Sequence, residues 1–371
     1  MRILQVYKDY YPVLGGIENH VRLLAEGMAA RGHQIAVLTT ARGSRTIRSE
    51  LGGVPITAVG RLGTFASAPL SPLLPLALAA AKADLIHLHL PDPTGDLAVQ
   101  LAASRIPLVV TYHSDIVRQR RALMLYGPQL RRTLRRARRV IATSPNYVRS
   151  SPFLAPLAER CRVAPLGIDL APFMQAPPDE VAAIRARFPG PLVLFVGMLR
   201  YYKGADRLIR AMAALPDARL LLIGREATVR SGDLQQLAAG LGIADRVHLL
   251  GVQESLPAYF HAADVFVLPS VERSEGFGIV QIEAQAAGLP IVATELGTGT
   301  SYVTIHGETG IIVPPDNPPA LARAIRVLLE NPALARSYGE SGRRRAQREF
   351  SVERMLDRIE AIYREAQSAI G

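Results

Sequence analysis

Short apolar runs of strand length alternate along the chain with longer stretches in which apolar residues recur at helical spacing. The run Ile3–Val6 is followed by a glycine-containing loop, a helical stretch from Ile17 and a second apolar run at 35–38. Such strand–loop–helix–strand units are typical of parallel α/β sheets. Further strands are expected at 84–90, 107–111, 140–142, 192–196, 219–223, 247–250, 264–268 and 291–294.

The pattern restarts at Leu192, after a segment that holds four prolines within residues 171–190. We interpret this proline-rich segment as a linker between two domains. The sequence therefore predicts a Rossmann-like domain at 1–170 and another of similar size at 191–351. Helical stretches at 319–331, 332–349 and 352–370 complete the chain.

The segment 269–290 places two glycines between a predicted strand and a predicted helix. The strand ends at Pro269, Gly276 and Gly278 follow in the loop, and the helical run from Ile279 stops at Gly288. Free backbone N–H groups at a helix N-terminus favour a phosphate. The glycines thus mark a candidate anion-binding site.

Two carboxylates flank this candidate site. Glu275 lies in the loop, and Glu283 lies after seven intervening residues in an otherwise uncharged helix. Taken alone, Glu275 would fit a helix cap and Glu283 a solvent-facing residue. In combination with Glu275-Gly276-Phe277-Gly278, the pair resembles the signature of the retaining glycosyltransferases of family 4, and the resemblance covers nearly the whole chain.

That resemblance implies an α/β fold of the GT-B type, in which two Rossmann-like domains with parallel sheets face each other across a cleft. The N-terminal domain then carries the acceptor side and the C-terminal domain binds the nucleotide-sugar donor. Residues 352–371 are expected to form a helix that crosses back to the N-terminal domain.

The resemblance also implies roles for individual residues. Glu275 and the amides of Gly276, Phe277 and Gly278 hold hydroxyls of the donor sugar, and Glu283 binds the ribose. His113 matches a histidine that contacts the sugar near the anomeric centre, and Gly16 matches the last glycine of a loop over the diphosphate. From the residues alone, His113 also fits a structural role, and the Gly15-Gly16 pair a plain tight turn.

Transfer from a sugar nucleotide releases a nucleoside diphosphate, whose negative charge must be stabilised. We expect the cations for this in the loop 197–204, the first loop of the second predicted domain. Lys203 can place an ammonium on a phosphate there, although a solvated surface lysine is the plainer interpretation. Family members usually carry a basic residue where this chain has Met198, and Arg200 is the candidate replacement. Since no Asp-x-Asp motif is present, we expect no metal and no cofactor beyond the donor itself.

His87 and His89 share one face of a predicted strand and could bind a metal ion. No third ligand is apparent from the sequence. We therefore expect the two histidines to be structural or to line the acceptor cleft, and we predict no metal site.

The formal net charge of +11 suits nucleic acid, an anionic membrane or a phosphorylated substrate. Neither a zinc finger nor an RNA-binding pattern is present, so a nucleic-acid partner is not expected. The single cysteine, Cys161, excludes an intramolecular disulfide and agrees with a cytoplasmic protein. No signal-peptide pattern precedes the first strand, and the most apolar stretch, 69–81, is too short and too interrupted by prolines to span a bilayer.

Residues 118–139 contain nine arginines and no acid, interleaved with leucines. Gly127-Pro128 is expected to break this segment into two helices. A basic amphipathic pair of helices is typical of proteins on anionic membranes, whereas a solvated charged face is the alternative. The location expected is the cytoplasm, peripheral on the inner face of the cell membrane.

Several loops resemble those of bacterial transferases that build surface polysaccharides. We expect a retaining, metal-independent hexosyltransferase that moves mannose from GDP-mannose to a saccharide or lipid-linked saccharide. The alternatives are a UDP-sugar-dependent transferase, a GT-B epimerase or hydrolase acting on sugar nucleotides, and a non-catalytic nucleotide binder.

Overall fold

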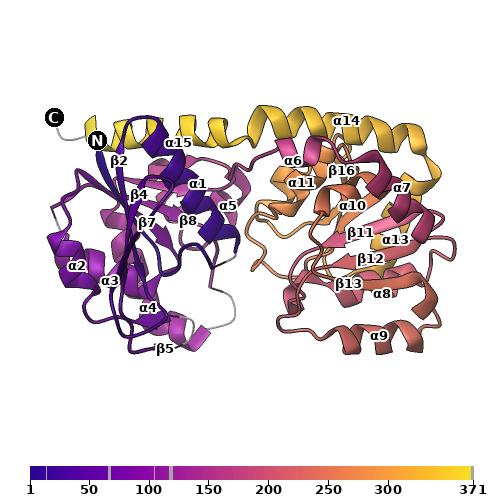
Figure 1. The fold of residues 1–371 in the computed structure, drawn as a ribbon, viewed down its shortest axis with the longest axis horizontal. Helices are drawn as coiled ribbons and strands as arrows, with labels where there is room; N and C mark the ends of the chain where they lie inside the picture. Colours follow the sequence, from indigo (N-terminus) through magenta and orange to yellow (C-terminus); the bar gives the residue numbers. More distant parts are fainter. Residues whose placement is uncertain (14, 66–67, 104, 117–119, 369–371) are drawn as a thin grey trace. The chain divides into compact units, whose positions relative to one another are not determined.

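The computed structural model describes residues 1–13, 15–65, 68–103, 105–116 and 120–368, and the chain forms two compact α/β units (Figure 1). Unit 1 comprises Met1–Gly167 and Val352–Gly371, and unit 2 comprises Ile168–Ser351. Helix α15 (Val352–Ser368), for which the resemblance implies a return to the N-terminal domain, is part of unit 1.

Unit 1 is built on an eight-stranded sheet in the order β10-β9-β8-β7-β1-β2-β4-β3. All neighbouring strands are parallel except the edge pair β3–β4, which is antiparallel. The strands are β1 (Arg2–Val6), β2 (Gln34–Thr40), β3 (Ile47–Leu51), β4 (Val54–Val59), β7 (Leu85–Leu90), β8 (Leu108–Tyr112), β9 (Arg139–Ala142) and β10 (Cys161–Val163). Strands β5 (Gly63–Phe65) and β6 (Ala68–Leu70) form a separate antiparallel pair.

The apolar residues of the unit 1 helices and strands form two buried clusters. In one cluster, α1 and α15 pack together, and a Cβ at Gly27 would lie 2.5 Å from Cδ1 of Leu356. The absence of a side chain at Gly27 therefore allows the two helices to approach closely. The helices are α1 (Gly16–Ala30), α2 (Leu74–Ala80), α3 (Pro93–Ala102), α4 (Arg120–Arg136), α5 (Pro145–Ser150), the 3₁₀ segment η1 (Ala155–Arg160) and α15.

Unit 2 contains a six-stranded, wholly parallel sheet in the order β13-β12-β11-β14-β15-β16. The strands are β11 (Leu192–Val196), β12 (Arg219–Ile223), β13 (Val247–Gly251), β14 (Val265–Leu268), β15 (Ile291–Thr294) and β16 (Gly310–Val313). The strand order reverses between β11 and β14, and the crevice at such a switch point is where open α/β sheets bind ligands.

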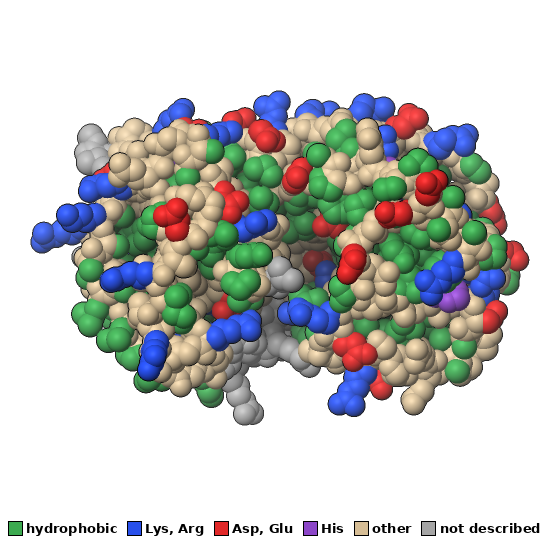
Figure 2. Space-filling model, viewed as in Figure 1, with side chains coloured by type: hydrophobic (Ala, Val, Ile, Leu, Met, Phe, Trp, Pro, Cys, Tyr) green, Lys and Arg blue, Asp and Glu red, His purple; other side chains and the backbone are tan. Residues whose placement is uncertain are grey.

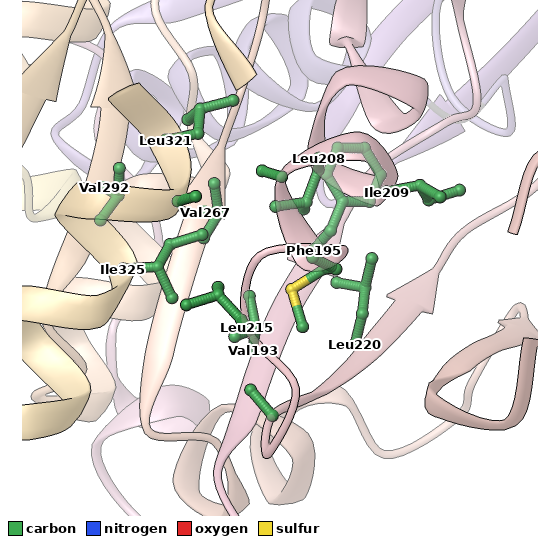
Figure 3. Close-up of a cluster of buried hydrophobic side chains, with 14 of the residues drawn as sticks. Val193, Phe195, Leu208, Ile209, Leu215, Leu220, Val267, Val292, Leu321 and Ile325 are labelled. Carbon is green, nitrogen blue, oxygen red and sulfur yellow. The ribbon is translucent and has the colours of Figure 1, made fainter. Parts of the chain in front are cut away.

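Helices cover the unit 2 sheet and bury its central strands. Figure 3 shows Val193 and Phe195 of β11 and Val267 of β14 among side chains from neighbouring helices. This packing fixes the ends of β11 and β14 in place. The helices are α6 (Ala171–Met174), α7 (Pro178–Arg187), η2 (Tyr201–Lys203), α8 (Ala205–Met212), α9 (Ser231–Gly240), η3 (Ala244–Arg246), α10 (Leu256–Ala262), α11 (Val280–Ala287), α12 (Thr300–Val303), α13 (Pro318–Glu330) and α14 (Pro332–Glu349).

The segment 171–190, interpreted from its prolines as a linker, is an integral part of unit 2. Pro172 and Pro178 lie in the first turns of α6 and α7, where a missing N–H is not needed. Ile184 and Phe188 are buried in the core below α7. The prolines therefore mark helix starts and not an extended connection.

The prediction that Gly127-Pro128 separates two helices is wrong, because α4 continues through Pro128. A proline inside a helix lacks one backbone hydrogen bond and clashes with the carbonyl four residues earlier, and its ring also clashes with the Cβ of the preceding residue. Gly127 has no Cβ, so part of that clash is absent. Among the described residues, no helix combines the length and apolar content that a membrane span needs.

Candidate functional site

At the switch point of unit 2, two candidate site residues that belong to separate loops lie close together. Lys203 follows β11 and Glu275 follows β14, and Nζ of Lys203 lies 2.5 Å from Oε2 of Glu275. Only 13% and 9% of their side-chain surfaces are exposed. The roles expected from the sequence differ for the two residues, and the structure shows them as a buried ion pair.

The two loops that carry this pair pack directly on each other. The 3₁₀ turn η2 ends at Gly204, whose φ of +70° is the left-handed conformation that favours glycine. A Cβ at Gly204 would collide with the carbonyl oxygen of Pro269. In addition, the N–H of Val271 donates to the carbonyl of Tyr202 at 2.8 Å. These contacts hold Lys203 against the Glu275 loop.

Hydrogen bonds fix both the side chain and the backbone of Glu275. Ser270 Oγ donates to the Glu275 carboxylate at 3.1 Å, and Thr298 Oγ1 donates to the Glu275 carbonyl at 2.7 Å. The N–H of Gly299 donates to the carbonyl of Gly276 at 2.8 Å. The carboxylate is thus positioned before any ligand arrives.

Lys203 remains a cation in this environment. Burial lowers the pKa of the ammonium, but the charge of Glu275 and the Tyr202 side chain outweigh burial, and the net shift raises the pKa. An ammonium has three hydrogens to donate. Lys203 can therefore contact a phosphate oxygen while it remains close to Glu275.

Arg200 precedes η2 and is exposed to solvent. Its charge lies close enough to act on Lys203, whose pKa it lowers as a minor effect. The structure therefore places the candidate replacement for the missing basic residue near the ion pair, outside the buried contact itself.

Helix α11 ends at Gly288, as predicted from the sequence, with a φ of +76°. Before the helix, Gly278 has a φ of +79°, and a Cβ there would lie 2.6 Å from Nε2 of Gln281 and 2.8 Å from Cδ2 of Leu268. Gly278 is therefore required both by its backbone conformation and by the space available.

Phe277 directs its ring into unit 2 and away from solvent. The ring packs edge-on against Phe350, with centroids 6.0 Å apart and an interplanar angle of 83°. A Cβ at Gly299 would collide with the Phe277 ring, so that glycine makes room for it. The Phe277 side chain is therefore a packing element, which leaves its backbone amide for a ligand.

Glu283 lies in the first turn of α11 and is partly buried. Among the described residues, its carboxylate makes no hydrogen bond. Burial raises the pKa of Glu283 to about 7, and the nearby Lys203 charge only partly opposes this shift. Glu283 is therefore an unpaired acceptor that changes its charge near neutral pH.

In unit 1, Gly16 is the exposed first residue of α1, next to the N-cap Gly15. A Cβ at Gly15 would collide with the carboxylate of Glu18. The absence of a side chain at Gly15 therefore lets an acidic group lie against the beginning of the helix. Residue 14 of the predicted glycine loop lies outside the described residues.

His113 follows β8 and is buried beside His89 of β7, with Nε2 of His113 3.1 Å from Nδ1 of His89. The sequence offered no third ligand for the predicted pair His87 and His89, but the structure brings His113 and His20 to it. One nitrogen each of His20, His89 and His113 lie within 4.8 Å of one another. Sequence reasoning missed His20, although its spacing of four and eight residues from Leu24 and Met28 places it on the buried face of α1.

Comparison with known families assigns both halves of the chain. Residues 14–172 match the family described as Glycosyltransferase Family 4, and residues 182–345 match that described as Glycosyl transferases group 1. The D-rhamnosyltransferase WbpZ of Pseudomonas aeruginosa is 36% identical over 95% of this chain and 93% of its own length. The O-antigen chain mannosyltransferase C of Escherichia coli is 33% identical over 98% of both.

Solved structures with the same fold include a sucrose-phosphate synthase and a protein in complex with a sugar nucleotide. The sucrose-phosphate synthase of Thermosynechococcus elongatus has a TM-score of 0.83 at 27% identity and covers 99% of each chain. Anabaena HepE, solved in complex with UDP-glucose, has a TM-score of 0.77 at 23% identity, covering 98% of this chain and 99% of that one. These comparisons confirm the fold class predicted from the sequence.

Proposed function

The chain belongs to glycosyltransferase family 4 and has the GT-B fold, and from this we propose that it moves a hexose, with retention and without a metal, from a nucleotide-sugar to a saccharide or lipid-linked saccharide. Its relatives named above transfer D-rhamnose and mannose, and one of them acts on O-antigen chains. We therefore assign the protein to polysaccharide or lipopolysaccharide synthesis, with GDP-mannose as the proposed donor.

The buried pair of Lys203 and Glu275 at the switch point of unit 2 is the observation that carries this proposal. A departing nucleoside diphosphate develops negative charge that fixed cations and dipoles stabilise. Lys203 supplies such a cation, and Glu275 supplies a fixed acceptor for sugar hydroxyls. Glu283, partly buried and unpaired among the described residues, supplies an acceptor for the ribose.

The proposed reaction needs no protein nucleophile. The bond from the sugar's anomeric carbon to the phosphate oxygen breaks as the acceptor oxygen bonds to the same face of that carbon. The departing phosphate takes the acceptor's proton, so the products are the glycoside and the nucleoside diphosphate. In this scheme, Lys203 and the amides near Gly278 stabilise the leaving group, while His113 contacts the sugar and Gly16 belongs to the loop over the diphosphate.

Donor choice is tested by thermal unfolding in the presence of different nucleotides. A ligand that binds only the folded state stabilises it by RT ln(1 + [L]/Kd), about 2.7 kcal/mol at a hundredfold excess over Kd. We expect GDP and GDP-mannose to raise Tm by a few degrees. A larger rise with UDP and UDP-glucose would replace GDP by UDP in the proposal, and no rise with either pair would contradict nucleotide-sugar binding.

Nucleotide affinity is expected to depend on pH through Glu283. Its pKa of about 7 means that the carboxylate loses its proton, and becomes a better acceptor for ribose hydroxyls, as pH rises through neutrality. Each pH unit below this pKa should weaken the Glu283 contribution by up to about tenfold. Calorimetric titration of GDP between pH 6 and 8.5 measures this slope.

The matched control for this prediction is Glu283→Gln, which keeps the side-chain shape and cannot ionise. The phosphate of GDP also titrates, and that contribution is common to both proteins. The difference between their slopes therefore isolates the carboxylate. Equal slopes in wild type and Glu283→Gln would remove Glu283 from the nucleotide site.

The proposed membrane contact rests on apolar side chains that unit 1 exposes on neighbouring elements. Met124 and Leu125 of α4 are 72% and 86% exposed. Helices α2 and α3 pack together, α3 packs against α4, and Figure 2 shows apolar and basic side chains on this unit. Further exposed apolar residues are Leu62, Phe65, Leu70, Leu73, Leu76, Leu97 and Leu101.

Only part of the arginine-rich segment is available to a membrane. Arg136 donates to the carbonyls of Val99 at 3.0 Å and Ile106 at 3.3 Å, and therefore caps the end of α3. Arg138 donates to the carbonyl of Ala366 at 2.9 Å, and Arg139 pairs with Glu365 at 2.7 Å. Three arginines of α4 are exposed, namely Arg131, Arg132 and Arg135. Arg118 and the side chains of Arg120 and Arg121 lie outside the described residues.

We expect the protein to sediment with anionic liposomes at low salt, and added salt should release it. Replacing Arg131, Arg132 and Arg135 together by Gln should weaken partitioning by about a hundredfold, at about 1 kcal/mol for each basic residue. Arg136 is left intact because it caps α3.

The matched control is the Gln replacement of Arg336, Arg344 and Arg348, which are exposed on α14 and change the net charge equally. This control should sediment like the wild type. If both triple variants bind liposomes equally, or if the wild type ignores anionic liposomes at low salt, the proposed membrane surface is wrong.

A further inference from the structure

A continuous chain of buried hydrogen bonds links α15 to His113 inside unit 1. Gln5 Nε2 of β1 donates to the hydroxyl of Tyr363 on α15 at 3.0 Å, and Gln5 Oε1 lies 2.7 Å from Nε2 of His89. His89 Nδ1 then lies 3.1 Å from Nε2 of His113. The side chains that make up this hydrogen-bond series are Tyr363, Gln5, His89 and His113, and all four are buried.

The donors and acceptors along this chain determine which nitrogen of His113 carries the hydrogen. An amide oxygen only accepts, so Nε2 of His89 must carry a hydrogen that it donates to Gln5. A neutral imidazole has one N–H, so Nδ1 of His89 is a lone pair and accepts from Nε2 of His113. His113 is then the Nε2–H tautomer, and its Nδ1 has a free lone pair.

The histidines in this cluster are neutral, as the assignment requires. Burial lowers the pKa of His89 and His113 well below the ordinary value of 6.5, and the neighbouring imidazoles lower it further. His20 packs edge-on against His113 with centroids 5.1 Å apart, and burial lowers its pKa to about 4. A second proton on one of these rings would place a charge in a region without a described counter-ion.

A side branch of the network runs from Tyr363 through His87 to Thr111. The Tyr363 hydroxyl accepts from Gln5, so its own hydrogen goes to Nδ1 of His87, which lies 2.6 Å away. His87 Nε2 is left to donate to Thr111 Oγ1, also at 2.6 Å. The hydrogen bonds of this branch do not include His113, and the branch therefore offers a control position in the same network.

The free nitrogen of His113 is the end of the chain that lacks a partner. Its Nδ1 is buried and has no hydrogen bond among the described residues. A buried acceptor without a partner is unfavourable, and a ligand hydroxyl would supply the missing hydrogen bond. His113 lies at the carboxyl end of β8, where parallel sheets present residues to ligands.

A metal ion fits this cluster less well than a ligand hydroxyl does. The rings of His89 and His113 are nearly parallel, at 18°, with centroids 5.3 Å apart. This separation equals about 3 Å between nitrogens plus the two ring radii, as expected when two nitrogens face each other in one N–H···N bond. The N–H of His113 and the lone pair of His89 are then directed at each other, and not at a common third point where an ion would bind.

We propose that Gln5 and Tyr363 are positioning residues that hold His113 as the Nε2–H tautomer, so that its Nδ1 accepts a hydrogen bond from a hydroxyl of the donor sugar. This inference rests on the proposed function for the identity of that ligand. The tautomer itself is a property of unit 1 and is measured without any ligand. Helix α15 thereby acts on a substrate-contacting residue that it does not touch.

The test uses ¹⁵N NMR of histidine-labelled full-length protein to determine which imidazole nitrogen of each histidine carries the hydrogen. Signals are assigned from single His→Gln variants. The wild type should show His113 with hydrogen on Nε2 alone. Tyr363→Phe removes the acceptor that orients the Gln5 amide, and should give a mixture of His113 tautomers. Thr111→Val breaks a hydrogen bond of equal burial on the side branch, and should leave His113 unchanged.

Two further measurements, sugar binding and turnover, would stay unchanged if Tyr363 had only a structural role. GDP-mannose should shift the Nδ1 signal of His113, and GDP alone should not. Tyr363→Phe should lower kcat/KM by about tenfold, the loss expected for one hydrogen bond, and Thr111→Val by less than about twofold.

Three results would overturn the proposal: hydrogen on Nδ1 or mixed tautomers in wild type, an unchanged tautomer in Tyr363→Phe, or zinc binding that displaces the shared hydrogen. A His113 signal that ignores the sugar in a protein that still transfers it would also overturn the proposal, while leaving the proposed function standing. Absence of transfer by the wild type would contradict the proposed function instead.

Discussion

Glu275→Gln is expected to lower turnover by about a hundredfold to a thousandfold while the protein stays folded, the range found when one fixed polar contact to a reacting group is lost. The amide keeps the size of the side chain and can still accept from Ser270. It loses the charge that pairs with Lys203 and that we propose to hold sugar hydroxyls. Steady-state rates with the preferred donor, together with thermal unfolding, measure both effects.

The control for this experiment is Glu308→Gln, which changes an exposed carboxylate of the same unit in the turn before β16. Its turnover should stay within about twofold of wild type, as for most surface substitutions. A folded Glu275→Gln protein with near wild-type turnover would exclude Glu275 from contact with the reacting sugar.

Lys203→Met is expected to reduce turnover by a similar factor. This loss of turnover should be larger than the loss that any metal chelator causes in the wild type. The ammonium is the buried cation next to Glu275 and the proposed stabiliser of the leaving diphosphate. Wild-type turnover should persist in excess EDTA. Loss of activity on chelation, restored by magnesium or manganese, would show that a metal supplies the charge assigned to Lys203.

Removing Lys203 alone leaves Glu275 buried without its partner, a change that typically costs 3–5 kcal/mol of stability. The double variant Lys203→Met/Glu275→Gln removes both charges and should recover much of that loss. If the double variant is as stable as wild type yet equally inactive as Lys203→Met, loss of activity follows from chemistry and not from unfolding.

The strands at the centre of unit 2 were predictable because their sequences are short, wholly apolar runs. The runs 192–196 and 291–294 match β11 and β15 residue for residue, since strands buried on both faces carry few polar positions, here only Thr294. The end of α11 at Gly288 was predictable for a similar local reason, because a left-handed glycine ends a helix.

The contact between Lys203 and Glu275 was not predictable from local pattern. The two residues are far apart in sequence, and they meet because β11 and β14 are neighbours in the sheet. The same limit applies to His20 and Tyr363, whose helices bring them to the histidines of β7. Sequence periodicity indicates that such residues are buried but not which side chain each one meets.

The local sequence pattern also led to wrong predictions where one residue type occurs in two structural contexts. Prolines at 172 and 178 suggested a linker but begin helices. Pro128 suggested a break but follows a glycine, which relieves its clash with the helix. The packing of the Phe277 ring on Phe350 was not indicated by the sequence, and the role predicted for the Phe277 amide stays a prediction.

Transfer of a sugar with its stereochemistry observed tests the central claim most directly. The protein is incubated with GDP-mannose, or with UDP-glucose as the alternative donor, and a lipid-linked saccharide acceptor, and the new glycosidic linkage is examined by NMR. The account predicts release of the nucleoside diphosphate together with a glycoside that keeps the donor's anomeric configuration. An inverted linkage, or release of free sugar without any glycoside, would contradict it.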